Sequence, residues 1–313
     1  MTWLKKNFVS LLVLLMALVG VGLLVYPTFS DWWNSFHQSR AVAGYAQAVA
    51  ELDPDRYKEV FEAAEKYNEK LCKSGVLWNM SDAEKKEYNA LLDVNGSGIM
   101  GYIDIPKINV TLPIYHGTDE AVLQIAIGHL AGTSLPVGGT GTHCSVSGHR
   151  GLPSARLFTD LDKLAPGDNW TVTVLDRTVT YEVDQIRIVL PSEVSELKID
   201  PEKDYFTLVT CTPYGINSHR LLVRGHRVEN AQGKVIVLAE GVLIEPVYLA
   251  LVIGVPILVL LFIWSMADAG RRVDYLRLSH SAADALNRRI ERRRQTDDSR
   301  ARKKPGDKGD SRS

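Results

Sequence analysis

Two long apolar runs near the ends of the chain predict membrane-spanning helices. Residues 8–26 are almost entirely Leu, Val and other apolar residues and follow a pair of lysines. Residues 247–267 hold no charged residue over 21 positions, enough for a helix to cross the roughly 30 Å apolar core of a bilayer. Neither run shows the polar stripe of a buried core helix. We expect a signal anchor in residues 1–28, with a cleaved signal peptide as the alternative, and a second span in residues 245–268.

Between these runs, the pattern predicts two helices and then a series of short strands. Asp53 followed by Pro54 is a helix start, and apolar residues then recur on one helix face up to Leu71. Ser81 opens a second helix with a capping-box pattern. From Gly98 onward, short apolar or alternating stretches are separated by turn residues, which is typical of a barrel or sandwich. The stretches expected to be strands are residues 101–105, 110–115, 170–175, 178–190, 206–212 and 221–228.

The charge distribution orients the chain in the membrane. The formal net charge is −1, yet residues 271–313 carry fourteen Lys and Arg against seven Asp and Glu. The positive-inside rule puts this basic tail and the N-terminal lysines in the cytoplasm, so the region between the two spans is exported. We expect residues 269–313 to form a cytoplasmic tail that is attracted to anionic membrane lipid rather than to nucleic acid.

One predicted hairpin carries candidate chemistry. The turn sequence PYGINS separates two strand-like stretches and sets Cys211 opposite Arg220. A nearby cation favours the reactive thiolate, although a lone cysteine in a strand is more often a small buried residue. Three cysteines, an odd number in an exported region, predict at least one free thiol. His149 lies between glycines, where its side chain is poorly shielded, but seven other histidines compete for a proton-transfer role.

Five motifs follow one another in order along the exported region. They read GYIDIPKI (residues 101–108), LPIYHG (112–117), SGHRGLP (147–153), TLVTCTPYG (207–215) and RLLVRG (220–225). Together they resemble the motifs of the sortases, specifically class C, the pilin polymerases of Gram-positive bacteria. The resemblance implies a mainly β fold: a sortase-type eight-stranded β-barrel with N-terminal helices, flanked by two transmembrane helices. It implies an N-terminal helical segment in residues 29–97 and a catalytic barrel in residues 98–240.

The same resemblance implies the roles of individual residues. Cys211 becomes the nucleophile, His149 the proton donor, and Arg220 the hydrogen-bond donor to the substrate carbonyl or oxyanion. Thr210, next to the nucleophile, is predicted to contact substrate. No cofactor is implied, and the sequence has no Cys/His cluster with metal-ligand spacing.

The resemblance also implies partners and a location. The implied partners are pilin proteins with an LPxTG-like C-terminal signal and an acceptor lysine. The implied location is the cell membrane, with two spans, an extracellular catalytic domain and both termini in the cytoplasm. Two alternatives stay open: a sortase that anchors proteins to a peptidoglycan amine of the cell wall, and a catalytically inactive, membrane-tethered scaffold module.

One loop departs from the class C pattern. Many class C sortases carry a lid loop with an Asp-Pro-aromatic motif that blocks the active site. The corresponding loop, residues 72–80, lacks this motif. Trp78 is the candidate for the aromatic plug, and packing between the N-terminal helices is the alternative role for it. Cys72 and Cys144 are interpreted as two free thiols, with a regulatory disulfide between them as the alternative.

Overall fold

The chain divides into two units, Met1–Val235 and Ile236–Ser313. The computed structural model describes residues 2–230, together with 256, 259, 263, 283–292 and 294. In the second unit, residues 283–292 are helical. The span predicted in residues 247–267 lies outside the described residues, apart from three single positions.

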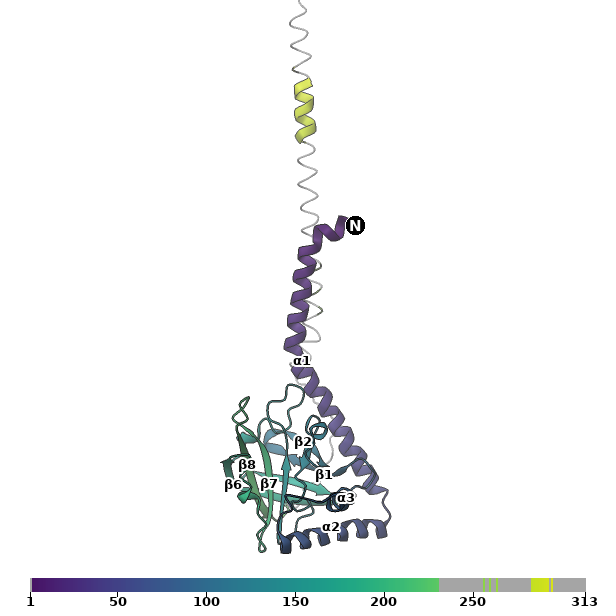
Figure 1. The fold of residues 1–313 in the computed structure, drawn as a ribbon. Coiled ribbons are helices and arrows are strands. Elements are labelled where there is room, and N and C mark those ends of the chain that lie inside the picture. Colours follow the sequence, from purple (N-terminus) through teal and green to yellow (C-terminus); the bar gives the residue numbers. More distant parts are fainter. Residues whose placement is uncertain are drawn as a thin grey trace, which may run out of the picture. The chain divides into compact units, whose positions relative to one another are not determined.

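Three helices precede the strands of the first unit (Figure 1). They are α1 (Thr2–Ala50), α2 (Pro54–Ser74) and α3 (Asp82–Ala90). Both predicted helix starts are confirmed: the Asp53 side chain accepts a hydrogen bond from the Asp55 N–H, and Ser81 forms a complete capping box with Glu84. The first helix continues through Pro27.

Part of α1 is long and apolar enough to cross a membrane. This candidate span begins within the stretch Leu15–Ala50, close to the N-terminus. It is the one such helix among the described residues. Proline is tolerated inside apolar spanning helices, because other groups can compensate for the hydrogen bond it removes.

The eight strands form a closed barrel, as the sequence predicts. Their order around the barrel is β1-β2-β3-β4-β7-β8-β6-β5, and β5 pairs with β1 to close it. The β2–β3 and β4–β7 pairs are parallel, and the other pairs are antiparallel. The strands are β1 (Ile99–Ile105), β2 (Val110–His116), β3 (Ile127–His129), β4 (Thr142–Ser147), β5 (Asn169–Val174), β6 (Arg177–Val189), β7 (Asp204–Thr212) and β8 (His219–Val228).

Large aromatic side chains fill the barrel. Trp170, Tyr181 and Phe206 are fully buried, with ring centroids 5.2 to 6.3 Å apart. Burying an aromatic ring of this size stabilises the fold by roughly 1.5–3 kcal/mol. On the outside, α1 runs along one side of the barrel and α2 lies across one end (Figure 1). Tyr45 of α1 is buried, and its hydroxyl donates to the Met100 carbonyl and accepts from the Leu175 N–H.

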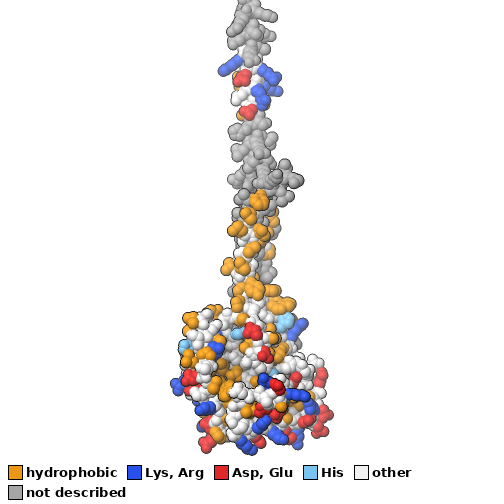
Figure 2. All heavy atoms as spheres, in the orientation of Figure 1, with side chains coloured by type: hydrophobic (Ala, Val, Ile, Leu, Met, Phe, Trp, Pro, Cys, Tyr) orange, Lys and Arg blue, Asp and Glu red, His pale blue; other side chains and the backbone are white. Residues whose placement is uncertain are grey.

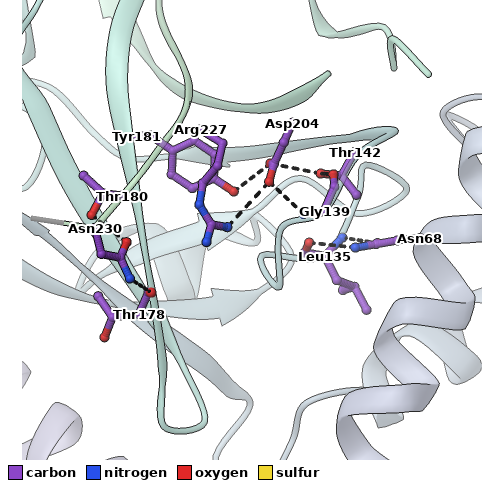
Figure 3. A network of polar contacts seen from close by, with 10 residues as sticks. All are labelled: Asn68, Leu135, Gly139, Thr142, Thr178, Thr180, Tyr181, Asp204, Arg227 and Asn230. Atoms are coloured by element: carbon purple, nitrogen blue, oxygen red, sulfur yellow. Dashed lines mark hydrogen bonds and ion pairs between the residues drawn. The ribbon is translucent and has the colours of Figure 1, made fainter. Parts of the chain in front are cut away.

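A carboxylate ties several segments together where β7 begins. Asp204 accepts hydrogen bonds from the Tyr181 hydroxyl (2.9 Å), the Gly139 N–H (2.7 Å) and the Thr142 hydroxyl (3.2 Å). Arg227 adds an ion pair at 3.6 Å, and Figure 3 shows these groups converging on the carboxylate. Asp204 is seven residues before Cys211, or roughly 23 Å along an extended strand. This network therefore fixes the end of the barrel remote from the candidate nucleophile.

Two buried histidines hold loops against the barrel. The His129 Nδ1 lies 2.9 Å from the Tyr88 hydroxyl of α3, and its Nε2 lies 2.9 Å from the Ser134 carbonyl oxygen. His143 Nδ1 lies 2.7 Å from the Lys198 carbonyl oxygen, and its Nε2 lies 2.7 Å from the Thr207 hydroxyl. In each ring one nitrogen donates to a carbonyl and the other accepts from a hydroxyl, which a neutral imidazole satisfies. Burial lowers the pKa of each ring from 6.5 to about 4.

Because these two histidines are buried and neutral, we expect the free energy of unfolding to decrease in acid. Above pH 6.5 both rings are neutral whether the chain is folded or unfolded, so their contribution to stability is complete. As the pH falls from 6.5 to about 4, the unfolded chain takes up protons that the folded chain does not, and the free energy of unfolding decreases. Each unit of pKa difference corresponds to about 1.4 kcal/mol. We expect denaturant titrations at a series of pH values to show this loss.

Two variants test whether the buried histidines cause the loss of stability in acid. Gln in place of His143 should flatten the pH dependence, whereas the same change at the exposed His37 should not. Stability that stays constant from pH 6.5 to 4, or an equal slope in His143→Gln and wild type, would contradict the assignment.

Candidate active site

The hairpin of β7 and β8 brings a thiol beside a guanidinium. Cys211 near the end of β7 and Arg220 near the start of β8 are register partners across the antiparallel pair. The predicted hairpin is confirmed, and both side chains are partly exposed. Among the described residues, both hydrogen bonds of the Arg220 guanidinium come from Nη1, which donates to the carbonyl oxygens of Asn217 and His219. Its other N–H groups are therefore free to meet a ligand beside the thiol.

A parallel strand pair carries His149 to the same place. Strand β4 pairs with β7, with Ser147 opposite Val209. The Gly148 N–H donates to the Val209 carbonyl at 3.1 Å, which extends the contact by one residue. His149 is the next residue after this contact, and Cys211 lies two positions beyond Val209 on β7. The structure thus pairs Cys211 with Arg220 in register and brings the backbone just before His149 to β7.

Thr210 holds the His149 segment in place. The sequence predicts that it contacts substrate, but its side chain is 1% exposed and donates to the Gly148 carbonyl at 2.7 Å. Since Gly148 directly precedes His149, this bond fixes the backbone that presents the imidazole. Substrate contact by Thr210 stays a prediction, while its hydroxyl bond holds the backbone before His149.

The imidazole of His149 points towards an acidic residue. Its Nε2 lies 3.8 Å from Oε1 of Glu120, at the start of the short helix α4 (Glu120–Leu123). This nitrogen is buried and has no hydrogen-bond partner in the described part of the chain. Glu120 is 72% exposed, so the pair is screened by solvent and only weakly stabilising. Sequence reasoning missed Glu120, because only the folded barrel brings α4 to His149.

Arg150 links the two strands that carry the site. Its side chain is 10% exposed, and its Nη1 donates to the Thr212 hydroxyl at 3.3 Å. Its Nη2 is paired with Asp162. Arg150 directly follows His149, and Thr212 directly follows Cys211. The hydrogen bond between Arg150 and Thr212 therefore joins the two segments that carry these candidate catalytic residues. Apart from its position next to His149, nothing in the sequence indicates this role.

An aromatic ring and a glycine close the other side of the histidine loop. A side chain at Gly151 would bring its Cβ within 2.6 Å of the Tyr214 ring, and the backbone there has φ +76°. The loop that follows Cys211 therefore packs against the loop that follows His149, and only glycine permits this contact.

A small apolar cluster lies beside Cys211 on the sheet. It is separate from the barrel interior, and its members come from β6, β7, β8 and the loops beside them. Val209 lies two residues before Cys211 on β7, so the two side chains face the same side of the sheet. This arrangement places a small buried apolar cluster beneath the strand that carries the nucleophile. The cluster consists of Leu130, Val189, Leu197, Val209 and Leu222.

All three cysteines are free thiols, in agreement with the favoured interpretation of the sequence. Cys144 is fully buried, and burial raises the pKa of its thiol well above the ordinary value. Cys72 packs against Gly141, just before β4 begins. Cys211 is the cysteine that is both partly exposed and paired in register with an arginine.

Trp78 lies in the loop between α2 and α3 and is 43% exposed. The neighbouring Leu77 N–H donates to the Gly132 carbonyl at 3.0 Å, which ties this loop to the turn after β3. No hydrogen bond, ion pair or ring contact joins Trp78 to Cys211 or His149 among the described residues. Its role as a lid residue stays a prediction.

The chain is similar to proteins of known family. The Sortase domain model matches residues 103–228. The chain is 56% identical to sortase C1 from Streptococcus agalactiae, with a TM-score of 0.60, covering 61% of this chain and 100% of that one. It is 41% identical to sortase C of Streptococcus pneumoniae, with a TM-score of 0.55, covering 61% of this chain and 97% of that one.

A curated relative gives a shorter match. Sortase D from Bacillus subtilis is 31% identical over 131 residues, which make up 41% of this chain and 63% of that protein. The chain therefore spans less than two thirds of that relative's length.

Proposed function

Because the chain belongs to the sortase family, and to the class C sortases within it, we propose that it is a membrane-anchored cysteine transpeptidase that polymerises pilins. The observation that carries the proposal is the register of three neighbouring strands, which sets Cys211 between Arg220 and the backbone that presents His149. A nucleophile, a proton donor and an oxyanion donor are the parts that acyl transfer requires.

The first half-reaction cleaves the sorting signal. The Cys211 thiolate attacks the carbonyl carbon of the Thr–Gly amide in an LPxTG-like sequence, and the free N–H groups of Arg220 donate to the resulting oxyanion. As the C–N bond breaks, the His149 imidazolium gives its proton to the leaving nitrogen. The products are an amine, which departs with the Gly fragment, and a thioester between threonine and Cys211.

The second half-reaction joins two subunits. The ε-amino group of an acceptor lysine attacks the thioester carbonyl and passes a proton to His149, which is neutral at this stage. The thiolate of Cys211 leaves, and an isopeptide bond remains.

The pilin acceptor and the membrane anchor are supported by separate observations. The solved sortase C of Streptococcus pneumoniae is described in terms of its pilin substrate specificity. The apolar stretch of α1 supports anchoring at the N-terminus. We propose two spans, with the barrel outside the cell and both termini in the cytoplasm, on the pattern of apolar runs and basic residues in the sequence.

The acceptor is tested by competition. The full chain would be incubated with an LPxTG-type peptide, a pilin domain bearing the lysine, and a peptidoglycan stem peptide bearing a free amine. We expect an isopeptide-linked pilin product. Exclusive transfer to the stem peptide would identify a cell-wall-anchoring sortase instead, and the absence of both cleavage and transfer would support the inactive scaffold.

Lysine in place of Arg220 is expected to lower kcat by about 10²- to 10³-fold. Lysine keeps the positive charge but loses the fixed fork of N–H donors that can reach an oxyanion while Nη1 still binds the loop carbonyls. Steady-state cleavage of an LPxTG-type peptide measures the effect. Arg227→Lys, at the other end of β8, is the matched control and should stay near wild type. Wild-type activity in Arg220→Lys would remove Arg220 from the proposed mechanism.

A further inference from the structure

Five aromatic residues form an exposed cluster on α1, directly after its apolar stretch. They are between 36% and 56% exposed, although each is large and mainly apolar. Their rings contact one another, for example Phe29 with Trp33 at 6.4 Å and Trp32 with Phe36 at 6.4 Å. Figure 2 shows hydrophobic side chains gathered along this part of the helix. We call Tyr26, Phe29, Trp32, Trp33 and Phe36 the aromatic belt.

The opposite face of the same helical stretch is bonded to the barrel. The Asp31 carboxylate accepts from the Arg156 N–H at 2.6 Å. The Asn34 side chain donates to the Ser154 carbonyl at 2.6 Å, and the Gln38 side chain donates to the Ile125 carbonyl at 2.7 Å. At 3.6 residues per turn, positions 31, 34 and 38 share one face, and the belt is centred roughly opposite to it. The barrel therefore fixes the helix without covering its aromatic residues.

The loops that α1 holds are those beside His149. Ile125 follows α4, the helix whose first residue, Glu120, lies 3.8 Å from the His149 Nε2. Ser154 lies in the loop after His149, and the Phe158 N–H at the end of that loop donates to the His149 carbonyl at 3.1 Å. The polar face of α1 is thus bonded to two segments that contact the candidate proton donor.

We propose that the aromatic belt marks the membrane surface, beginning in the lipid headgroup region at Tyr26 and ending at its outer edge, and that it holds the active site there. The inference deepens the proposed function, since it rests on α1 being the membrane anchor. Aromatic side chains of this kind concentrate where a spanning helix leaves the apolar core. From Tyr26 to Asn34 the helix rises roughly 12 Å, and a headgroup region is only about 5–7 Å deep. The segments around His149 then lie at the outer edge of the lipid headgroups.

Because α1 is a single continuous helix, we infer that the membrane covers the aromatic belt. The belt begins where the apolar run of residues 8–26 ends, within a single uninterrupted helix. A bilayer that contains the run necessarily meets the belt next, whereas another protein would have to compete with lipid for it. An active site close to the membrane surface suits a substrate that is still anchored in the membrane.

Fluorescence quenching tests the depth of the belt. The full chain and the variant Trp32→Phe/Trp33→Phe would be placed in vesicles containing lipids brominated either near the headgroup or near the end of the acyl chain. The emission lost in the variant, obtained by difference, should be quenched more by the shallow bromines than by the deep ones. The control is Trp78→Phe, whose difference emission should respond to neither. The proposal is overturned if the difference emission from Trp32 and Trp33 is quenched by neither lipid, or is quenched mainly by the lipid brominated deep in the acyl chain.

An activity measurement tests the consequence for catalysis. Trp32→Ser/Trp33→Ser should cleave a water-soluble LPxTG-type peptide at the wild-type rate. It should cleave the same signal several-fold more slowly when a transmembrane segment anchors the signal in the vesicle. Equal loss on both substrates, or no loss on either, would contradict the positioning role. If wild type cleaves neither substrate, the proposed function fails, whereas the quenching experiment still decides where the belt lies.

Discussion

Alanine in place of Cys211 is expected to abolish cleavage of an LPxTG-type peptide, lowering kcat/KM by on the order of 10⁵- to 10⁶-fold. In the proposed mechanism the sulfur of Cys211 forms the covalent bond, and neither of the other two cysteines is placed to replace it. Cys144 is buried inside the barrel, and Cys72 lies against Gly141, at the end of β4 remote from His149. Peptide cleavage followed by chromatography measures the loss.

The thiol of Cys72 provides a matched control for this variant. Cys72→Ala removes a partly exposed thiol away from the site and should leave kcat/KM unchanged. Cys211→Ala should unfold at the same denaturant concentration as wild type, because the side chain is small and partly exposed. Cleavage that persists in Cys211→Ala, or that disappears in Cys72→Ala, would show that a different group is the nucleophile.

Alanine in place of His149 is expected to lower kcat by about 10²- to 10⁴-fold, the usual contribution of a positioned proton donor. The amide nitrogen of the signal is a poor leaving group unless it is protonated as the bond breaks. An ester analogue of the same signal has a better leaving group. We therefore expect the variant to lose much less activity on the ester than on the amide.

This difference between substrates separates proton transfer from a structural effect. A variant with a distorted site would lose activity on both substrates alike. His226→Ala, a partly exposed histidine on β8, is the control and should match wild type on both. An equal loss on ester and amide would contradict the role of His149 as general acid.

The features that the sequence predicts well are local ones. The hairpin around Cys211 depends on two strand-like stretches and a turn within 23 residues, so its pairing and register are evident without the rest of the fold. The starts of α2 and α3 depend on caps that span no more than four residues. Motif order adds His149, which local sequence alone does not distinguish from the other histidines.

The features that the sequence misses depend on distant contacts. Strand β4 is parallel to β7 and is buried at all but its last residue, so it lacks the alternation that marks a half-exposed strand. Strand β3 has only three residues. The contacts of Glu120 and Arg150 with the site come from segments that only the closed barrel brings together. Thr210 is assigned to substrate from its position beside Cys211, because the sequence does not reveal that its hydroxyl points to Gly148.

The local sequence also does not predict that α1 continues past Pro27. Proline usually ends a helix, and the stretch that follows Pro27 is polar and aromatic rather than apolar. The structure carries the helix on to Ala50, because residues such as Val42 and Tyr45 pack against the barrel. Tertiary packing thus extends a helix that its own sequence would interrupt.

The proposed mechanism requires that Cys211 forms a thioester with the sorting signal. Wild-type protein mixed with an LPxTG-type peptide, without an acceptor amine, would be quenched in acid and its intact mass measured. We expect a mass increase equal to the peptide acyl group, located on Cys211 by peptide mapping, removed by hydroxylamine and absent from Cys211→Ala. Rapid cleavage without any adduct, or an adduct located on Cys72, would contradict it.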